Sequence, residues 1–218
     1  MVTFSLSRDY AIQSEQALSY NQQLLNLNQT LDQQVQERTQ HIELLNQRLN
    51  EQLKKDVLTG ALNRYALNEE IQQRFADARM NHQSLAFFML DVDYFKNYND
   101  AYGHLKGDDV LKGIVETLQA ILPSQAILAR YGGEEFAIVA SNMPKSDALK
   151  FVDICLSQIR QMQIRHEYRL DDKSMITISI GGAVMDHTHP YTDIISLMKT
   201  ADQQLYIAKN HRDCAVVI

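Results

Sequence analysis

The chain has 218 residues, and its 27 acidic side chains outnumber its 21 basic ones, giving a formal net charge of −6 at pH 7. Because a domain of about 100–200 residues is typical, we expect one globular domain with an appendage rather than two full domains. Hydrophobic residues make up 45% of the chain, which allows a buried core and excludes wholesale disorder. The net acidity argues against a protein that grips a nucleic-acid backbone by broad charge neutralisation.

The sequence lacks the signals of a membrane-spanning or secreted chain. It has no run of about 18 apolar residues, and its first nine residues lack the basic and apolar segments of a secretory signal. Cys155 and Cys214 lie far apart without metal-type spacing, so we expect both to be packing residues in a reducing compartment. The expected location is cytoplasmic, either as a whole protein or as the cytoplasmic part of a larger, membrane-attached one.

Residues 1–55 differ in composition from the rest of the chain. Glycine and proline first occur at Gly60, whereas residues 10–55 are rich in Gln, Leu, Asn and Glu. Apolar residues recur in this segment at the alternating spacing of a coiled-coil seam: Leu24, Leu31, Val35, Ile42, Leu45 and Leu49. Asn21 and Asn28 fall at seam positions where a buried amide pair favours two strands in register. We expect a helical stalk that forms a parallel homodimer; the alternative is one amphipathic helix folded back on the domain.

From Asp56 onward, short apolar strands alternate with amphipathic helices. Asp56–Gly60 predicts a turn, because Gly60 can adopt the backbone angles that stop a helix. Leu85–Val92 is a near-continuous apolar run, typical of a central strand. The other expected helices and strands, in chain order, are helix 64–80, helix 108–122, strands 126–131 and 136–140, helix 146–162, strand 175–185, helix 193–209 and strand 215–218. This order predicts an α/β sandwich built on one mixed sheet.

A first group of acidic residues, Asp91–Asp100, begins where the apolar strand ends. Carboxylates at the tip of a buried strand are costly to desolvate unless they have a partner. A hard divalent cation is a natural partner, because Mg²⁺ takes oxygen ligands and keeps open positions for phosphate. A solvated loop with a few acids is the alternative that this segment alone leaves open.

A second group lies in Arg130–Phe136. The glycine pair Gly132–Gly133 between two apolar strands predicts a two-residue hairpin turn with positive φ at both glycines. The next strand opens with Glu134 and Glu135. If the hairpin pairs beside the strand that ends at Asp91, three carboxylates meet at one sheet edge and repel unless metal ions neutralise them. That arrangement suits two-metal phosphoryl transfer, with ions for the phosphates and a carboxylate to accept a proton.

Four motifs, in order, resemble those of the GGDEF-domain diguanylate cyclases over roughly residues 56–218. Asp56–Arg64 resembles the family's opening turn, with an alanine where leucine is usual. Within Asp91–Asp109, the residues from Asp91 to Asp108 follow the pattern D-[IV]-D-x-F-K-x-x-N-D-x-x-G-H-x-x-G-D without a gap. Arg130–Phe136 is the signature hairpin in its GGEEF form, and Thr177–Gly181 resembles the late T-x-S-x-G strand.

The resemblance implies a fold, a reaction and partners. The implied fold is similar to nucleotidyl cyclases and polymerase palm domains: a central mixed, mainly antiparallel sheet flanked by helices. The implied reaction joins two GTP molecules into cyclic di-GMP and releases two pyrophosphates. Each ribose 3′-oxygen attacks the α-phosphate of the other GTP, so two domains must face each other. The implied cofactor is Mg²⁺, with Mn²⁺ left open, and the implied partners are GTP and a second copy of the chain.

The resemblance also implies roles for the acidic residues. Asp91 is implied to bind metal through its carboxylate, and Val92 through its backbone carbonyl. Glu134 is implied to bind metal and to serve as, or to place, the base that deprotonates the ribose 3′-hydroxyl. Glu135 is implied to be a second metal ligand or a carboxylate near the phosphates.

Substrate-binding roles follow from the same resemblance. Asn99 and Asp108 are implied to recognise guanine, since a carboxylate accepts hydrogen bonds from the N1–H and 2-amino groups, and adenine offers neither donor there. The other implied substrate-binding residues are Phe95, Lys96, His104, Gly107, Lys209 and Arg212.

Two departures from the family pattern change these expectations. The last helix of family members ends A-K-x-x-G-R, whereas Ala208–Arg212 is one residue shorter and lacks the glycine, so Arg212 matches only across a local deletion. Many members also carry R-x-x-D before the hairpin as an inhibitory product site. Pro123–Ala126 stands there without either charge, so we predict that product inhibition through that site is absent.

Two other functions are weighed against an active cyclase. The first is a catalytically silent module that binds GTP or cyclic di-GMP; the intact Glu134 and Glu135 argue against it. The second is another nucleotidyl cyclase or a polymerase-like enzyme, which Asp108 and the ungapped guanine motif disfavour.

Overall fold

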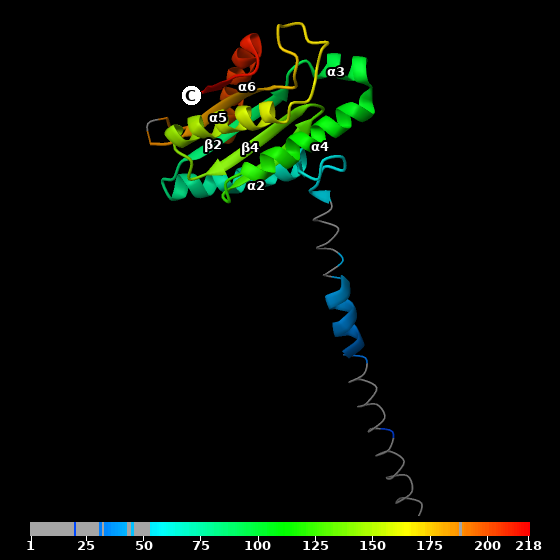
Figure 1. Ribbon diagram of the computed structural model, residues 1–218. Coiled ribbons are helices and arrows are strands. Elements are labelled where there is room, and N and C mark those ends of the chain that lie inside the picture. The colour runs from blue at the N-terminus through cyan, green and yellow to red at the C-terminus, as the bar shows by residue number, and fades with distance from the viewer. Residues whose placement is uncertain (1–19, 21–30, 32, 43–44, 46–52, 188) are drawn as a thin grey trace, which may run out of the picture. The chain divides into compact units, whose positions relative to one another are not determined.

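The structure, a computed structural model, describes residues 20, 31, 33–42, 45, 53–187 and 189–218 (Figure 1). It divides into two compact units, Met1–Leu53 and Lys54–Ile218. In the first unit, residues 31 and 33–42 are helical. No helix among the described residues is long and apolar enough to cross a membrane.

The described part of the expected coiled-coil seam is exposed in a single chain. Leu31, Val35, Ile42 and Leu45 each leave 42–61% of their surface accessible. The other expected seam positions, Asn21, Leu24, Asn28 and Leu49, lie outside the described residues. The coiled coil therefore stays a prediction.

The second unit is built on a mixed, mainly antiparallel sheet, which confirms the expected fold class. Its strand order, among the described residues, is β1-β3-β4-β2-β5-β6. The two outer pairs, β1–β3 and β5–β6, are parallel, and the inner pairs are antiparallel. The strands are β1 Leu62–Asn63, β2 Leu85–Val92, β3 Ala126–Gly132, β4 Glu135–Ser141, β5 Ile178–Met185 and β6 Ala215–Val217.

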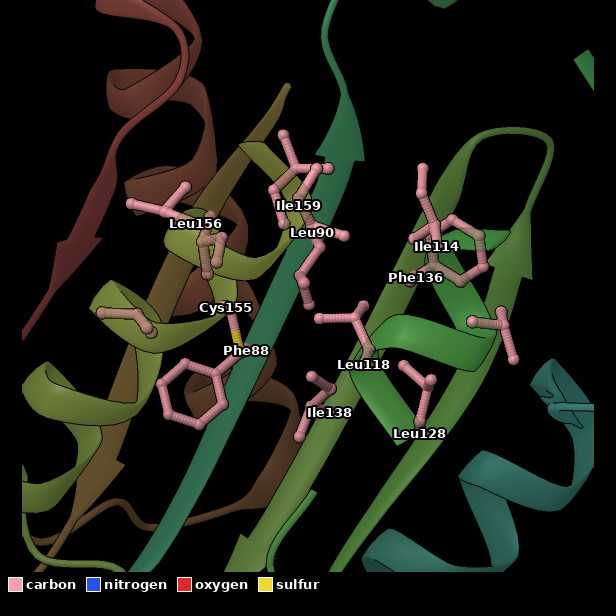
Figure 2. Close-up of a cluster of buried hydrophobic side chains, with 14 of the residues drawn as sticks. Phe88, Leu90, Ile114, Leu118, Leu128, Phe136, Ile138, Cys155, Leu156 and Ile159 are labelled. Carbon is pink, nitrogen blue, oxygen red and sulfur yellow. The ribbon is translucent and has the colours of Figure 1, made fainter. Parts of the chain in front are cut away.

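Helices cover both faces of this sheet (Figure 1). They are α2 Arg64–Met80, α3 Phe95–Tyr102, α4 His104–Ile121, α5 Lys145–Gln161 and α6 Ile194–His211. On one face, α4 and α5 pack against Phe88, Leu90 and Ile138 (Figure 2). On the other face, α2 and α6 pack against Phe87 and Met89. Adjacent residues of β2 thus enter opposite cores, because side chains alternate along a strand; this explains its unbroken apolar sequence.

Three local expectations were wrong. The helix expected from Asp108 begins at His104, and α3 precedes it, with Gly103 at a φ of 86° between them. The strand expected from Met175 begins at Ile178. In the hairpin, Gly133 has a φ of 53°, but Gly132 is not in the positive-φ region. The turn residues are Gly133 and Glu134, so a turn with glycine in the first central position replaces the expected pair.

Candidate active site

The candidate site lies at the end of the sheet where β2 stops and the hairpin turns. Asp91 is the cross-strand partner of Glu135, and the Val92 amide donates to the Glu134 carbonyl at 3.3 Å. Backbone pairing therefore brings together the three acidic residues that the sequence predicted for this sheet edge. Asp91 is 5% exposed, whereas Glu134 and Glu135 are half-buried.

Arg130 holds the hairpin to the turn at Asp56–Gly60. Its Nε donates to the Gly133 carbonyl at 2.9 Å, and its Nη1 donates to Asp56 Oδ1 at 3.1 Å. The same Asp56 oxygen accepts from the Thr59 amide at 3.0 Å and from the Thr59 hydroxyl at 2.7 Å. These contacts fix the hairpin backbone beside Glu134 without using a carboxylate of the site.

A lysine from the last helix reaches the same sheet edge. Lys209 Nζ lies 2.7 Å from Asp91 Oδ2. The pKa of the Asp91 carboxyl is raised to about 6, chiefly by burial and also by the nearby Glu134 and Glu135, although the Lys209 ammonium lowers it. The site therefore holds excess negative potential around a carboxylate that has a single cationic partner in the described structure.

The chemistry of these donors fits a hard divalent cation. Carboxylate and backbone carbonyl oxygens are the ligands that Mg²⁺ takes, and a cation would offset both the burial and the carboxylate repulsion that raise the pKa of Asp91. Among the described residues, however, no three His, Cys, Asp or Glu side chains already form a group that could hold a metal ion. The protein thus offers part of a coordination shell, and Mg²⁺ commonly completes its shell with water and substrate phosphates.

Asp93 has an environment unlike that of Asp91, two residues away. It has no exposed surface. It accepts hydrogen bonds from the Thr177 hydroxyl at 2.6 Å, the Ser179 hydroxyl at 2.7 Å and the Asp213 amide at 2.9 Å. Arg212 Nη1 lies 3.5 Å from its Oδ1. The sequence motifs contain Asp93, Thr177 and Ser179, but their spacing gave no sign that these residues contact one another.

A second group of predicted residues gathers where α3 meets α4. A Cβ added to Gly107 would lie 1.8 Å from Asn99 Oδ1 and 3.1 Å from Phe95 Cζ, so any larger residue would displace the Asn99 side-chain amide. Asn99 Oδ1 is buried and has no hydrogen-bond partner in the described part of the chain. Asp108 follows Gly107 directly and is half-buried. Three residues predicted to shape one pocket are therefore neighbours, and one of them has an unused acceptor.

The remaining predicted residues lie on helices α3 and α4 and directly after α6. Lys96 is exposed in the first turn of α3, and His104 is exposed at the first position of α4. Arg212 follows the end of α6, half-buried, with its guanidinium carbon 3.9 Å from the centre of the Tyr94 ring. Arg212 thus lies beside Asp93 although the helix end is shorter than in the family pattern.

The comparison with protein families decides the identity of this unit. The family model described as "Diguanylate cyclase, GGDEF domain" matches residues 53–214. The chain belongs to the GGDEF family. The match covers the sheet, its helices and both groups of predicted site residues, so the GGDEF domain and the compact second unit nearly coincide.

Solved structures of other GGDEF proteins share this architecture. The coiled coil and GGDEF domain of DgcB from Caulobacter crescentus, in complex with c-di-GMP, has a TM-score of 0.73 at 25% identity, covering 86% of this chain and 99% of that one. Diguanylate cyclase SiaD from Pseudomonas aeruginosa, in complex with its activator SiaC, has a TM-score of 0.71 at 27% identity, covering 98% of this chain and 79% of that one. The active GGEEF domain of a diguanylate cyclase from Vibrio cholerae has a TM-score of 0.60 at 32% identity, covering 71% of this chain and 96% of that one.

Curated relatives are longer than the matched region. An uncharacterised membrane protein of Staphylococcus aureus is 33% identical over 135 residues, which is 61% of this chain and 36% of that protein. The matched stretch thus spans about a third of that relative. In that relative, the stretch that matches this chain is therefore joined to additional sequence.

Proposed function

We propose that this chain is a diguanylate cyclase that condenses two GTP molecules into cyclic di-GMP and two pyrophosphates. The observation that carries the proposal is the meeting of Asp91, Glu134 and Glu135 at one sheet edge, with Lys209 beside them. A silent binding module has no need of three carboxylates gathered at one place. The GGEEF domain of the Vibrio cholerae cyclase, described as active, carries the hairpin form that this chain has.

The proposed reaction assigns the proton and the leaving group. A ribose 3′-oxygen bonds to the α-phosphorus of the second GTP, and the bond from that phosphorus to the bridging oxygen of the β-phosphate breaks, releasing pyrophosphate. Glu134 takes the 3′-hydroxyl proton, or positions the group that does. The same step at the second GTP closes the ring, so one domain supplies half of the reaction.

Mg²⁺ is the proposed cofactor, and Mn²⁺ would satisfy the same oxygen ligands. Asp91, Glu134, Glu135 and the Val92 carbonyl would hold it, and when bound it would neutralise phosphate charge. Lys209, now paired with Asp91, would then be free to contact a phosphate oxygen. Lys96 and Phe95, at the start of α3, would line the triphosphate.

Guanine would occupy the space between α3 and α4. The unpaired, buried Asn99 Oδ1 supports this assignment, because a buried acceptor without a partner is costly unless a ligand supplies a donor. Asp108 would accept from the N1–H and 2-amino groups of the base. His104 and Gly107 would shape the same pocket, with Gly107 leaving room for Asn99.

The two half-sites must face each other, and we propose that residues 1–55 supply the dimer as a parallel coiled coil. Apolar side chains at Leu31, Val35, Ile42 and Leu45 are exposed in the single chain, which is a cost that a second copy would remove. A coiled coil would also raise the effective concentration of the second domain. Its register and torsion would then determine whether the two sites can meet.

Incubation of the purified chain with GTP and Mg²⁺, followed by chromatography and mass spectrometry, tests the proposal. The expected product has the mass of cyclic di-GMP. Glu134→Gln should lower turnover by about 10²–10⁴-fold, the usual effect of losing a general base. Glu116→Gln, the same change at an exposed position of α4, is the matched control and should leave turnover unchanged. GTP binding without any product would instead favour the silent binding module.

A further inference from the structure

Two acidic residues at the end of β2 face two basic residues at the end of α6. Asp91 pairs with Lys209 at 2.7 Å, and Asp93 pairs with Arg212 at 3.5 Å. Asp93 directly follows β2, and Arg212 directly follows α6. The end of the strand and the end of the helix are thus joined by two ion pairs.

The two aspartates differ in how many acceptor positions remain free. A carboxylate accepts about four hydrogen bonds. Asp93 receives the two hydroxyls of Thr177 and Ser179, the Asp213 amide and the Arg212 guanidinium. Asp91, by contrast, has Lys209 as its one side-chain partner in the described structure. Asp91 would therefore give up at most its contact with Lys209 to take a metal ion, whereas Asp93 would have to break a complete set of hydrogen bonds.

The backbone that carries Arg212 is held in a conformation that it would not adopt alone. Arg212 and Asp213 have φ values of 56° and 51°, in the left-handed region that disfavours residues with a Cβ. Arg160 and Lys173 hold the Asp213 carboxylate at 2.8 and 2.6 Å. The family pattern has a glycine at this helix end, which this chain lacks. These bonds, together with the Asp93 contact to the Asp213 amide, hold the backbone at positive φ without it.

The Arg212 side chain is restrained on two sides. Its Nη1 faces Asp93, and its guanidinium carbon lies 3.9 Å from the centre of the Tyr94 ring. A guanidinium has five N–H donors, and Asp93 engages a single nitrogen of it. The other donors stay available beside the sheet edge that carries Asp91.

We propose that Asp93 is a positioning residue, which holds the Arg212 guanidinium so that its remaining N–H donors bind the phosphates of the nucleotide. The proposal rests on the proposed function, because it takes a guanosine triphosphate as the ligand. Asp93 itself touches neither the metal nor the substrate. The Asp93 carboxylate is itself held in place through Arg169. The fully buried Arg169 side chain donates to the Thr177 hydroxyl at 2.9 Å, and that hydroxyl donates to Asp93.

Binding of a triphosphate that cannot react tests this role apart from turnover. The probe is 3′-deoxy-GTP with Mg²⁺, which lacks the attacking hydroxyl; guanosine, which lacks phosphates, is the comparison ligand. We expect Arg212→Ala to raise the Kd for 3′-deoxy-GTP about tenfold and Asp93→Asn about fivefold, the range of a lost charge-assisted hydrogen bond. The Kd for guanosine should change less than about twofold, because the guanine contacts do not involve Arg212.

The double variant distinguishes positioning from general structural support. In the Arg212→Ala background, Asp93→Asn should change the Kd for 3′-deoxy-GTP by less than about twofold, because the side chain on which it acts is absent. An undiminished effect in that background, or an equal loss of guanosine affinity, overturns the proposal. If Asp93→Asn does not fold, Ser179→Ala removes one hydrogen bond from the oxygen that faces Arg212, and it must weaken triphosphate binding without weakening guanosine binding.

The wild-type chain separates this proposal from the function on which it rests. A wild-type chain that binds no triphosphate overturns the proposed function, and with it the ligand assigned to Arg212. A wild-type chain that makes cyclic di-GMP, together with an Asp93→Asn variant of unchanged affinity for 3′-deoxy-GTP, overturns the role of Asp93 alone.

Discussion

At the scale of single residues, the two glycines of the hairpin have different backbone requirements. Gly133 has a φ of 53°, so alanine there is strained, whereas Gly132 lies outside that region. A Cβ at either position would meet no atom within 4 Å. Nothing in the described fold therefore requires glycine at Gly132, and the open space beside it is where a triphosphate would approach the backbone.

This difference predicts two separable effects. Gly133→Ala should lower the free energy of unfolding by about 1–2 kcal/mol, the cost of a left-handed residue with a Cβ. Gly132→Ala should leave the free energy of unfolding within about 0.5 kcal/mol but should raise the Kd for 3′-deoxy-GTP, because its methyl group enters the space next to the phosphates. Urea denaturation and calorimetric titration measure the two quantities. An unchanged Kd for Gly132→Ala would contradict the placement of the nucleotide.

His166 predicts a pH dependence of stability. The residue has no exposed surface, and its Nε2 lies 3.1 Å from the Tyr94 carbonyl. Burial lowers the pKa of His166 below its usual value of 6.5. The unfolded chain therefore binds a proton at a higher pH than the folded chain does, so stability is full above about pH 6.5 and falls as the pH drops through the folded pKa.

The measurement compares urea midpoints of the wild type and His166→Gln at pH 7.5 and at lower pH, with glutamine keeping an N–H donor for the Tyr94 carbonyl. The wild type should lose more stability on acidification than the variant. Equal losses in the two proteins would show that other groups set the acid sensitivity.

At the scale of elements, the sequence predicted the helices and strands whose apolar residues follow a simple pattern. The apolar run of β2 and the regular apolar spacing of α5 and α6 gave boundaries within one or two residues of those observed. Burial explains this success, because a strand buried on both faces and a helix buried along one stripe each leave a distinct pattern. The position of Asp91 at a strand end was predictable for the same reason.

Elements that serve the site were harder to predict. Helix α3 has eight residues and begins after Tyr94, which has a left-handed φ of 56°; it is shorter than the window of about 11–18 residues in which a helical period is recognised. The partners of Asp93 come from β5 and its approach, and from the segment after α6, 84 to 120 residues away. Local patterns carry no information about such pairings, so the motifs placed Asp93 near the site but did not give its role.

The contact between the hairpin and the turn at residues 56–60 depends on the ion pair between Arg130 and Asp56, and the coupling free energy of that pair can be measured. Arg130 and Asp56 are 16% and 23% exposed, so their ion pair is less screened than a surface pair. A double-mutant cycle with Arg130→Ala and Asp56→Ala should give a coupling free energy of about 1 kcal/mol in urea unfolding. The exposed pair Lys150–Asp147, at 3.3 Å, is the control and should give a coupling near zero. Equal couplings would mean that the hairpin is not held through Arg130.

At the scale of the whole molecule, the segment before β3 predicts how the product acts on its own synthesis. Pro123–Ala126 forms a turn in which the Ala126 amide donates to the Pro123 carbonyl at 2.8 Å, and the four residues carry no charge. Cyclic di-GMP has two phosphates, and without an arginine there it lacks a bidentate partner. Initial rates of pyrophosphate release should therefore be unchanged when cyclic di-GMP is added at the start. A rate that falls at low product concentration would reveal a second inhibitory site.

Residues 1–55 predict how the activity depends on protein concentration. If they form a parallel coiled coil, the second domain is present at an effective concentration in the millimolar range at any protein concentration above the Kd of the coiled coil. Within that range, the specific activity of the full chain should stay constant as the protein is diluted. Residues 54–218, which contain the whole compact unit, must instead meet by collision, so their specific activity should fall roughly in proportion to concentration. Equal specific activities of the two proteins at low concentration would show that the dimer forms without the stalk.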